Sequence, residues 1–311
     1  MSKGSKKILL SGSIAYDYLY KFPGVFQDRL LNEQKGHLSV AFGVKDKCIH
    51  FGGCAGNTAY NAQMVGMDFI MIGIVGRDFE QYENWLKKNR INTDFVIRDN
   101  SYFTSQATVT TDKLGQQITF FYEGAAENSK NHSGEISKMI GKLAPELLCA
   151  LVSPNNHDFM LQTINSCIEN RVPFFFDPGQ ALPSFSASEL LNIINHSRGV
   201  FLNEYEFNML KSVLKLDLKE FLRLCPLVVV TLAEKGSKIY FNEEVIEVPT
   251  KQIKNSADPT GCGDAYRAGF LAEIAAQFPH MDLQSLTKAG QAGTLLALAC
   301  LKSSGTQNHV V

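Results

Sequence analysis

From residue 147 onward, the chain alternates between short apolar runs and longer amphipathic segments. The apolar runs are residues 147–152, 172–176, 199–202 and 227–232. Runs of this length are typical of strands buried on both faces, and the segments between them are long enough for helices. The alternation therefore predicts a parallel sheet with helices on both faces. Since the carboxyl ends of parallel strands meet at one edge, ligands are expected along that edge.

The first half of the chain adds strands of two kinds. Residues 7–12 and 69–75 are further buried runs. Residues 104–122 instead show a period of two, broken by a turn at 112–115, which predicts a hairpin. Because its polarity is mixed, this hairpin is expected to lie outside the main sheet. Residues 37–43 form another candidate strand that leaves the main sheet.

Other local signals predict single elements. Residues 76–78 open a helix, with Asp78 as its cap. Residues 238–241 and 245–249 predict a second, short hairpin. Residues 287–301 are rich in alanine and leucine and predict a core helix.

Composition limits the class of protein. Of the 311 residues, 45% are hydrophobic and 20% are charged, which suits one large α/β domain or a large domain with a small appendage. The net charge of −1 offers no electrostatic footprint for nucleic acid or a membrane surface. No apolar run approaches the roughly 20 residues that cross a bilayer. The seven cysteines show neither a paired nor a zinc-like spacing. We therefore expect a protein of the reducing cytoplasm, with no nucleic-acid or membrane partner.

Residues 258–270 contain the strongest chemical signal in the chain. Within this stretch, residues 260–263 place two glycines around a small residue, so that successive backbone N–H groups can turn toward one point. Residues 265–278 follow with apolar side chains at helical spacing, which puts this cradle at the positive end of a helix and predicts phosphate binding. Asp264 would repel a resting phosphate there, so it makes chemical sense as a base. The alternative is a first-turn carboxylate that only stabilises the helix.

Two other stretches carry candidate ligand contacts. Asp17 follows the first buried strand, where a ligand contact and a turn carboxylate are about equally expected. Residues 51–61 gather small residues in a loop that runs into a helix, so a ligand can approach the backbone closely. Their glycines lack the dinucleotide spacing, and no Lys-Ser or Lys-Thr pair follows. Asn57 in this stretch is either a ligand contact or a helix cap.

Both glycine-rich stretches resemble known signatures. Residues 258–270 resemble the C-terminal signature of the ribokinase-like (PfkB) carbohydrate and nucleoside kinases, and residues 51–61 resemble the N-terminal signature of that family. The resemblance covers essentially the whole chain. It implies an α/β fold, the ribokinase-like three-layer α/β/α domain with a mostly parallel central sheet and a small β-sheet lid. The whole chain, 1–311, would be one domain, and approximately residues 14–50 and 100–124 would form the lid.

The resemblance also implies roles for single residues. Asp264 would take the proton from a substrate hydroxyl. The backbone amides of three neighbours would form the anion hole: Gly261, Cys262 and Gly263. Cys262 stands where the family more often has alanine, a tolerable change because the amide carries the function. Phe121 of the hairpin would stack on a flat substrate, an interpretation that competes with a core aromatic of the lid. The acceptor residues would be Asp17, Gly53, Asn57, Phe121 and Gln180.

The nucleotide would lie at the ends of later strands. Asn203 and Glu206 are spaced to face one side of a first helical turn. This spacing suits outer-sphere binding of Mg²⁺ through water, with no direct metal ligand. A capping pair is the alternative, and the two are compatible. Thr231 and Gly236 bound a segment that resembles the nucleotide-binding loop of the family, although Ala233 replaces a usual glycine. Thr260 completes the expected ATP and Mg²⁺ residues.

Together these features predict an ATP- and Mg²⁺-dependent phosphotransferase acting on the 5′-hydroxyl of a ribonucleoside. Three short strings resemble bacterial adenosine kinases and favour adenosine as the acceptor: residues 121–125, 177–180 and 304–307. A sugar kinase acting on ribose or another furanose is an alternative, as is a non-catalytic nucleotide or nucleoside sensor. In some relatives K⁺ activates the enzyme and the lid forms a dimer contact. K⁺ and a homodimer through the lid are therefore further expectations.

Overall fold

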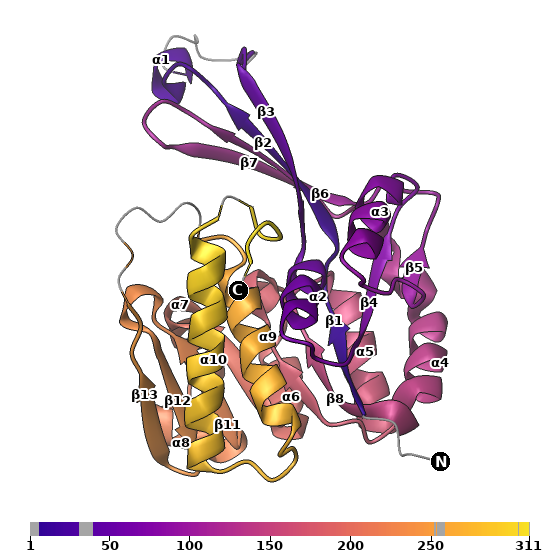
Figure 1. Cartoon of the computed structure of the whole chain (residues 1–311), viewed down its shortest axis with the longest axis vertical. Coiled ribbons are helices and arrows are strands. Elements are labelled where there is room, and N and C mark those ends of the chain that lie inside the picture. Colours follow the sequence, from indigo (N-terminus) through magenta and orange to yellow (C-terminus); the bar gives the residue numbers. More distant parts are fainter. Residues whose placement is uncertain (1–5, 31–39, 252, 254–258, 304, 311) are drawn as a thin grey trace.

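The computed structural model describes residues 6–30, 40–251, 253, 259–303 and 305–310. This part of the chain contains a nine-stranded sheet and a separate four-stranded sheet. Figure 1 shows the smaller sheet standing above one edge of the body that holds the larger one. No helix in these ranges has the length and apolar character needed to cross a membrane.

The larger sheet is parallel except at one end. Its strands lie in the order β13 (Glu244–Val248), β12 (Ser237–Phe241), β11 (Leu227–Thr231), β10 (Gly199–Asn203), β9 (Phe174–Phe176), β8 (Leu147–Val152), β1 (Lys7–Ser11), β4 (Phe69–Val75) and β5 (Val96–Arg98). The strands from β11 to β5 pair in parallel, and the hairpin of β12 and β13 pairs antiparallel. The predicted mostly parallel sheet and the second hairpin are confirmed.

Helices cover both faces of this sheet because consecutive strand residues point to opposite sides. In β1, Leu9 belongs to one buried cluster, whereas Ile8 and Leu10 belong to the other. The cluster of Leu9 packs against α4 (Ser133–Leu143), α5 (His157–Glu169), α6 (Ala187–His196), α7 (Glu204–Leu214) and α8 (Leu218–Leu224). The other cluster packs against α2 (Cys54–Met64), α3 (Glu80–Lys88), α9 (Cys262–Ala275) and α10 (Leu283–Leu301). The three-layer α/β/α fold is confirmed.

The four-stranded sheet, called the lid sheet below, has the order β3 (Asp46–Gly52), β2 (Ala15–Lys21), β6 (Ser105–Thr111) and β7 (Gln117–Tyr122). Strands β6 and β7 form the predicted hairpin, with Thr111 opposite Gln117. Strand β2 pairs in parallel with β6 and antiparallel with β3. The short helix α1 (Phe26–Leu30) follows β2, and 3-10 turns lie at Gly124–His132, Ala144–Glu146, Gly179–Ser184 and Ala233–Lys235.

Two of the predicted local features are wrong. Residues 40–43 are not a strand, residues 37–39 lie outside the described ranges, and the outer lid strand is β3 instead. Asp78 does not cap a helix, because α3 begins at Glu80 without a side-chain cap. The carboxylate of Asp78 instead accepts a hydrogen bond from the backbone N–H of Thr104 at 2.7 Å, which ties the end of β4 to the base of the lid sheet.

Two helices begin earlier than predicted. Helix α10 begins at Leu283 because Asp282 forms a capping box with Ser285, a pair that the apolar pattern did not reveal. Helix α9 begins at Cys262, so the expected cradle is itself the first turn of the helix. Its backbone N–H groups therefore lie at the helix N-terminus, where they have no acceptor within the helix, and the N–H of Cys262 donates to the carbonyl of Pro259 at 3.3 Å.

Candidate active site

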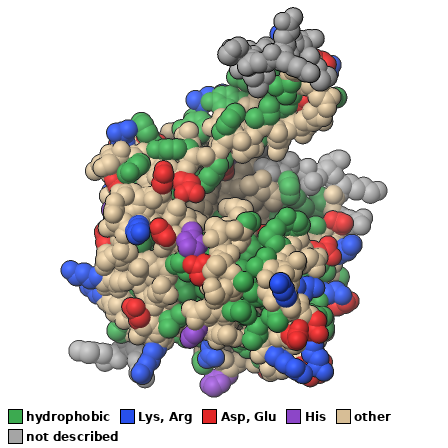
Figure 2. All heavy atoms as spheres, turned by 180° about the vertical axis from the view of Figure 1, so that it is seen from behind, with side chains coloured by type: hydrophobic (Ala, Val, Ile, Leu, Met, Phe, Trp, Pro, Cys, Tyr) green, Lys and Arg blue, Asp and Glu red, His purple; other side chains and the backbone are tan. Residues whose placement is uncertain are grey.

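Two cavities meet at the N-terminus of α9. The first, of about 850 Å³, lies between the loops after β10 and β11 and helix α10. The second, of about 660 Å³, lies beneath the lid sheet, where Figure 2 shows the molecule hollowed out. Gly263 lines both cavities, so the first turn of α9 separates them. A group bound in one cavity can thus reach a group bound in the other across this turn.

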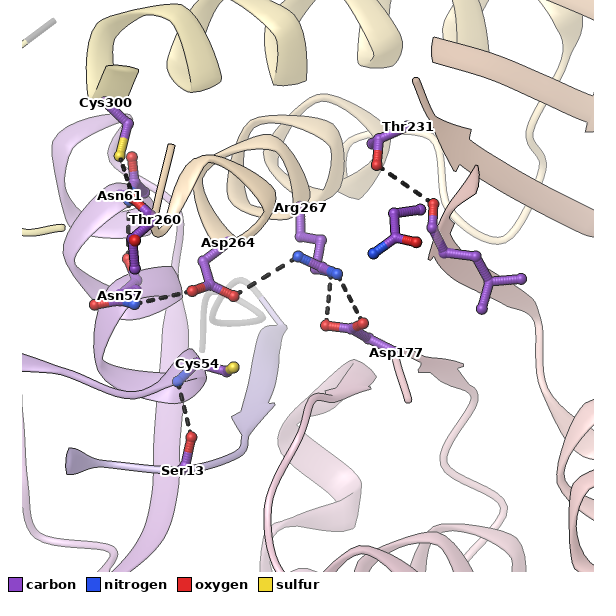
Figure 3. Close-up of polar contacts among 12 residues, drawn as sticks. Ser13, Cys54, Asn57, Asn61, Asp177, Thr231, Thr260, Asp264, Arg267 and Cys300 are labelled. Carbon is purple, nitrogen blue, oxygen red and sulfur yellow. Dashed lines mark hydrogen bonds and ion pairs between the residues drawn. The ribbon is translucent and has the colours of Figure 1, made fainter. Parts of the chain in front are cut away.

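Asp264 lies at this junction, in the second cavity. It is only 7% exposed, and its Oδ2 accepts a hydrogen bond from Nδ2 of Asn57 at 2.9 Å. Nη1 of Arg267 lies 3.7 Å from its Oδ1. Figure 3 shows the two side chains pointing toward each other. Burial raises the pKa of Asp264, and the charge of Arg267 opposes that rise, together with hydrogen bonds from Asn57 and Cys54. A carboxylate with a raised pKa is a stronger base, and this one faces a cavity.

The amide of Asn57 is fixed by residues far away in the chain. Nε2 of Gln307 donates to Oδ1 of Asn57 at 3.1 Å, and Nε1 of Trp85 donates to Oε1 of Gln307 at 3.1 Å. Since the oxygen of Asn57 is engaged as an acceptor, its NH₂ group must point to Asp264. Gln307 was noted in the sequence only as part of a family resemblance, and its structural role was missed.

The predicted acceptor residues converge on the second cavity. Its lining includes all five of them: Asp17, Gly53, Asn57, Phe121 and Gln180. Phe121 is 60% exposed, so in this structure its ring is available to a ligand and is not a core aromatic of the lid. Gly261, Thr260 and Glu206 also line this cavity. Thr260 and Glu206 were expected among the nucleotide residues, and both line this second cavity.

The first cavity collects the remaining nucleotide residues. Asn203, Thr231 and Gly236 line it, together with Cys262 and Gly263 of the expected anion hole. Ala233, which also lines it, has a φ of 50°, the left-handed region that glycine occupies more readily. The loop therefore has a glycine-like backbone at this position despite the side chain of Ala233.

Asn203 and Glu206 form the capping pair that was the alternative to a metal role. The side chain of Asn203 accepts from the N–H of Glu206 at 2.8 Å, and Glu206 accepts from the N–H of Asn203 at 2.8 Å. Asn203 lines the first cavity and Glu206 the second, so the pair lies beside the junction. A carboxylate at this place suits Mg²⁺, which prefers oxygen ligands and retains several waters.

The structure adds site residues that the sequence did not reveal. Arg267 lies one helical turn after Asp264 and contacts both Asp264 and Asp177. Asp177 was recognised as a polar residue at a strand end, but its partner was not. Cys54 donates its backbone N–H to Oγ of Ser13 at 3.0 Å and lines the second cavity, where burial raises the pKa of its thiol well above the usual value. Among these contacts, only the one between Asp264 and Arg267 follows from local spacing, because the two residues lie three positions apart on one helix.

Comparison with known proteins agrees with this geometry. The sequence pattern described as "pfkB family carbohydrate kinase" matches residues 40–311. A nucleoside kinase of Methanocaldococcus jannaschii is 30% identical, over 98% of this chain and 93% of that protein. A Burkholderia thailandensis nucleoside kinase solved with inosine is 30% identical and superposes with a TM-score of 0.82, over 97% of this chain and 93% of that chain. The structure of the same enzyme described as a complex with ADP-inosine gives a TM-score of 0.79 at 30% identity, over 98% and 92%.

Proposed function

Because this chain belongs to the pfkB family of carbohydrate kinases, we propose that it transfers the γ-phosphoryl group of ATP to the 5′-hydroxyl of a ribonucleoside. Membership makes it an ATP-dependent kinase with a hydroxyl acceptor. The observation that carries the proposal is the position of Asp264, a buried carboxylate at the turn where two cavities meet. One cavity would hold ATP and the other the nucleoside.

In the proposed reaction Asp264 acts as general base. It takes the proton of the acceptor hydroxyl while the oxygen forms a bond to the γ-phosphorus, and the bond from that phosphorus to the β–γ bridging oxygen breaks. ADP leaves with the electron pair of the broken bond. The backbone N–H groups of Gly261, Cys262 and Gly263 are placed at a helix N-terminus, where they favour the negative charge of the transferring group. Positioning and charge therefore account for most of the catalysis.

ATP and Mg²⁺ fit the residues around the first cavity. Thr231 and Gly236 would hold the nucleotide, and Asn203 and Glu206 would hold Mg²⁺ through water beside the first turn of α9. When bound, Mg²⁺ neutralises phosphate charge. Thr260 would assist from the acceptor side. K⁺ is proposed as a further activating ion on the family resemblance alone.

Adenosine is the acceptor we propose. The second cavity is lined by Asp17 and Asn57, which would bind ribose hydroxyls, and by the amide side chains of Asn155 and Gln180, which can pair with the edge of a base. The related enzymes are named nucleoside kinases, and one was solved with inosine, which makes inosine the main rival acceptor. The route is a salvage reaction that yields AMP and ADP.

A panel of acceptors tests this assignment. ADP release from ATP and Mg²⁺ is measured with adenosine, inosine, cytidine, ribose and fructose. We expect the largest kcat/KM with adenosine and little turnover with the free sugars. Turnover with ribose or fructose but not with nucleosides identifies a sugar kinase. Tight nucleoside binding in a thermal-shift assay without turnover of any acceptor identifies a sensor.

Phe121→Ala is expected to raise the KM of the nucleoside about tenfold and to leave the KM of ATP within twofold, because base–aromatic stacking contributes about 1–3 kcal/mol. The side chain of Phe121 lines the acceptor cavity. Phe120→Ala is the matched control, because Phe120 is the adjacent lid residue, is 67% exposed and is not part of that lining. Steady-state kinetics of both variants measure the effect. Equal changes in the two KM values for Phe121→Ala would refute stacking.

The proposal includes closure of the lid sheet over the bound nucleoside, with residues 14–50 and 100–124 as the lid within one domain. Closure would exclude the water that otherwise hydrolyses ATP. It also includes a homodimer through the lid sheet, whose outer strands in the described residues are β3 and β7. Light scattering of the purified protein measures the mass and tests the dimer.

A further inference from the structure

Arg267 lies between two carboxylates. Its Nη2 donates to Oδ1 of Asp177 at 2.7 Å, and its Nε lies 2.6 Å from Oδ2 of the same residue. Its Nη1 lies 3.7 Å from Oδ1 of Asp264. Figure 3 shows the guanidinium group spanning the space between the two acids. The side chain of Arg267 is 14% exposed and that of Asp177 is fully buried, so solvent screens these contacts weakly.

The acceptor cavity is acidic apart from this residue. Among the described residues that line it, Arg267 is the only lysine or arginine. The other ionisable side chains that line it come from several elements: Asp17, Cys54, Glu123, His157, Asp177, Glu206 and Asp264. A buried base in such surroundings tends to hold its proton, because burial and neighbouring negative charges both disfavour the carboxylate.

The guanidinium group opposes that tendency. Burial raises the pKa of Asp264, and Arg267 is the strongest influence that lowers it. Burial raises the pKa of Asp177 to about 7 even with Arg267 beside it, and Glu206 and Asp264 add to the rise. Burial lowers the pKa of Arg267 itself, but Asp177 and Asp264 raise it more, so its charge is permanent.

The same group packs against the expected anion hole. A Cβ atom on Gly263 would lie 2.5 Å from Nη1 of Arg267, so the glycine leaves room for the guanidinium beside the first turn of α9. Two of the nitrogen atoms of Arg267 are engaged by Asp177. Nε and Nη2 therefore hold the guanidinium group in place against Asp177, and only Nη1 faces Asp264.

We propose that Arg267 is a positioning residue that keeps Asp264 ionised and aimed at the acceptor hydroxyl, and that Asp177 anchors Arg267. This proposal rests on the proposed function, in which Asp264 is the base. Arg267 acts through Asp264. Its Nε and Nη2 atoms are engaged by Asp177, so this pair of donors is not free to bind a phosphate. The consequence is a specific pH dependence of turnover.

The test compares kcat and both KM values from pH 5 to 9 for the wild type, Arg267→Gln, Arg267→Lys and Asp177→Asn. Arg267→Gln removes the charge, so the pKa of the base rises and the acidic limb of the kcat profile moves up by about one pH unit. We expect kcat at pH 7 to fall about tenfold and the KM of ATP to change less than twofold. Arg267→Lys retains the charge and is expected to keep the limb near its wild-type position. Asp177→Asn removes a negative charge, so the limb is expected to move downward, and it also removes the anchor of Arg267, so the plateau of kcat above the limb is expected to fall.

A purely structural role for Arg267 predicts lower melting temperatures and lower kcat in these variants, with the acidic limb unmoved. That outcome overturns the proposal. If Arg267→Gln does not fold, the pH profiles of Asp177→Asn and Arg267→Lys provide the test. An acidic limb of the kcat profile that does not move in Asp177→Asn then rejects the positioning role of Arg267. Absence of wild-type turnover with every acceptor rejects the proposed function itself, so the two failures are distinguishable.

Discussion

Asp264→Asn is expected to lower kcat by a factor on the order of 10² or more, because it removes the positioned base from the acceptor hydroxyl. Asparagine keeps the size of the side chain and can still contact Asn57, which bonds Asp264 in the wild type. We therefore expect the dissociation constant of the nucleoside to change little. Rapid-mix measurement of ADP formation and calorimetric titration with the nucleoside separate the two effects.

The stability of this variant provides an independent check. A carboxyl group whose pKa is raised by folding destabilises the folded state once pH exceeds its unfolded pKa, and Asp264 has such a raised pKa. Removing its charge at pH 7 is expected to leave the melting temperature equal or higher. Asp94→Asn is the matched control, because Asp94 is exposed and precedes the amino end of β5, opposite the ligand edge. Near-normal turnover in Asp264→Asn would remove Asp264 from the role of base.

Gly261→Ala is expected to lower kcat about 10²-fold, the loss typical of a displaced oxyanion donor. Gly261 has a φ of 79°, and a Cβ atom there would lie 2.7 Å from Cγ2 of Thr306. Thr306 has little room to retreat, because it is buried and its hydroxyl donates to the carbonyl of Phe51 at 2.9 Å. The first turn of α9 must therefore shift, and its amides move away from the transferring phosphoryl group.

A second glycine separates this effect from backbone strain. Gly66 has a φ of 68°, and a Cβ atom there would have no neighbour within 4 Å. Gly66→Ala thus carries a similar left-handed cost, about 1–2 kcal/mol, without crowding. We expect Gly261→Ala to lose at least as much stability in urea as Gly66→Ala, because it adds crowding to the shared left-handed cost, and we expect only Gly261→Ala to lose turnover. Turnover of Gly261→Ala within threefold of the wild type would show that the anion hole does not depend on this contact.

The position of Asp264 was predictable because its neighbours in sequence are also its neighbours in the site. The glycines and the first turn of α9 form a continuous segment, and Arg267 follows Asp264 on the same helix. The hairpin of β6 and β7 was predictable for the same reason, since its period of two is a local pattern. Asp78 shows the limit of such reasoning. A carboxylate before a helix is usually a cap, but that of Asp78 instead accepts a hydrogen bond from the backbone N–H of Thr104, at the base of the lid sheet.

The sequence by itself determined the layered sheet, the separate hairpin and the glycine-rich turn that carries Asp264, because each depends on a pattern within one segment. Only the tertiary structure decided which side chains surround Asp264. Asn57 reaches Asp264 across 207 residues of chain, Gln307 reaches Asn57 across 250, and Arg267 reaches Asp177 across 90. Contacts at such separations arise from how strands and helices are stacked, and no local pattern records which side chains the stacking brings together.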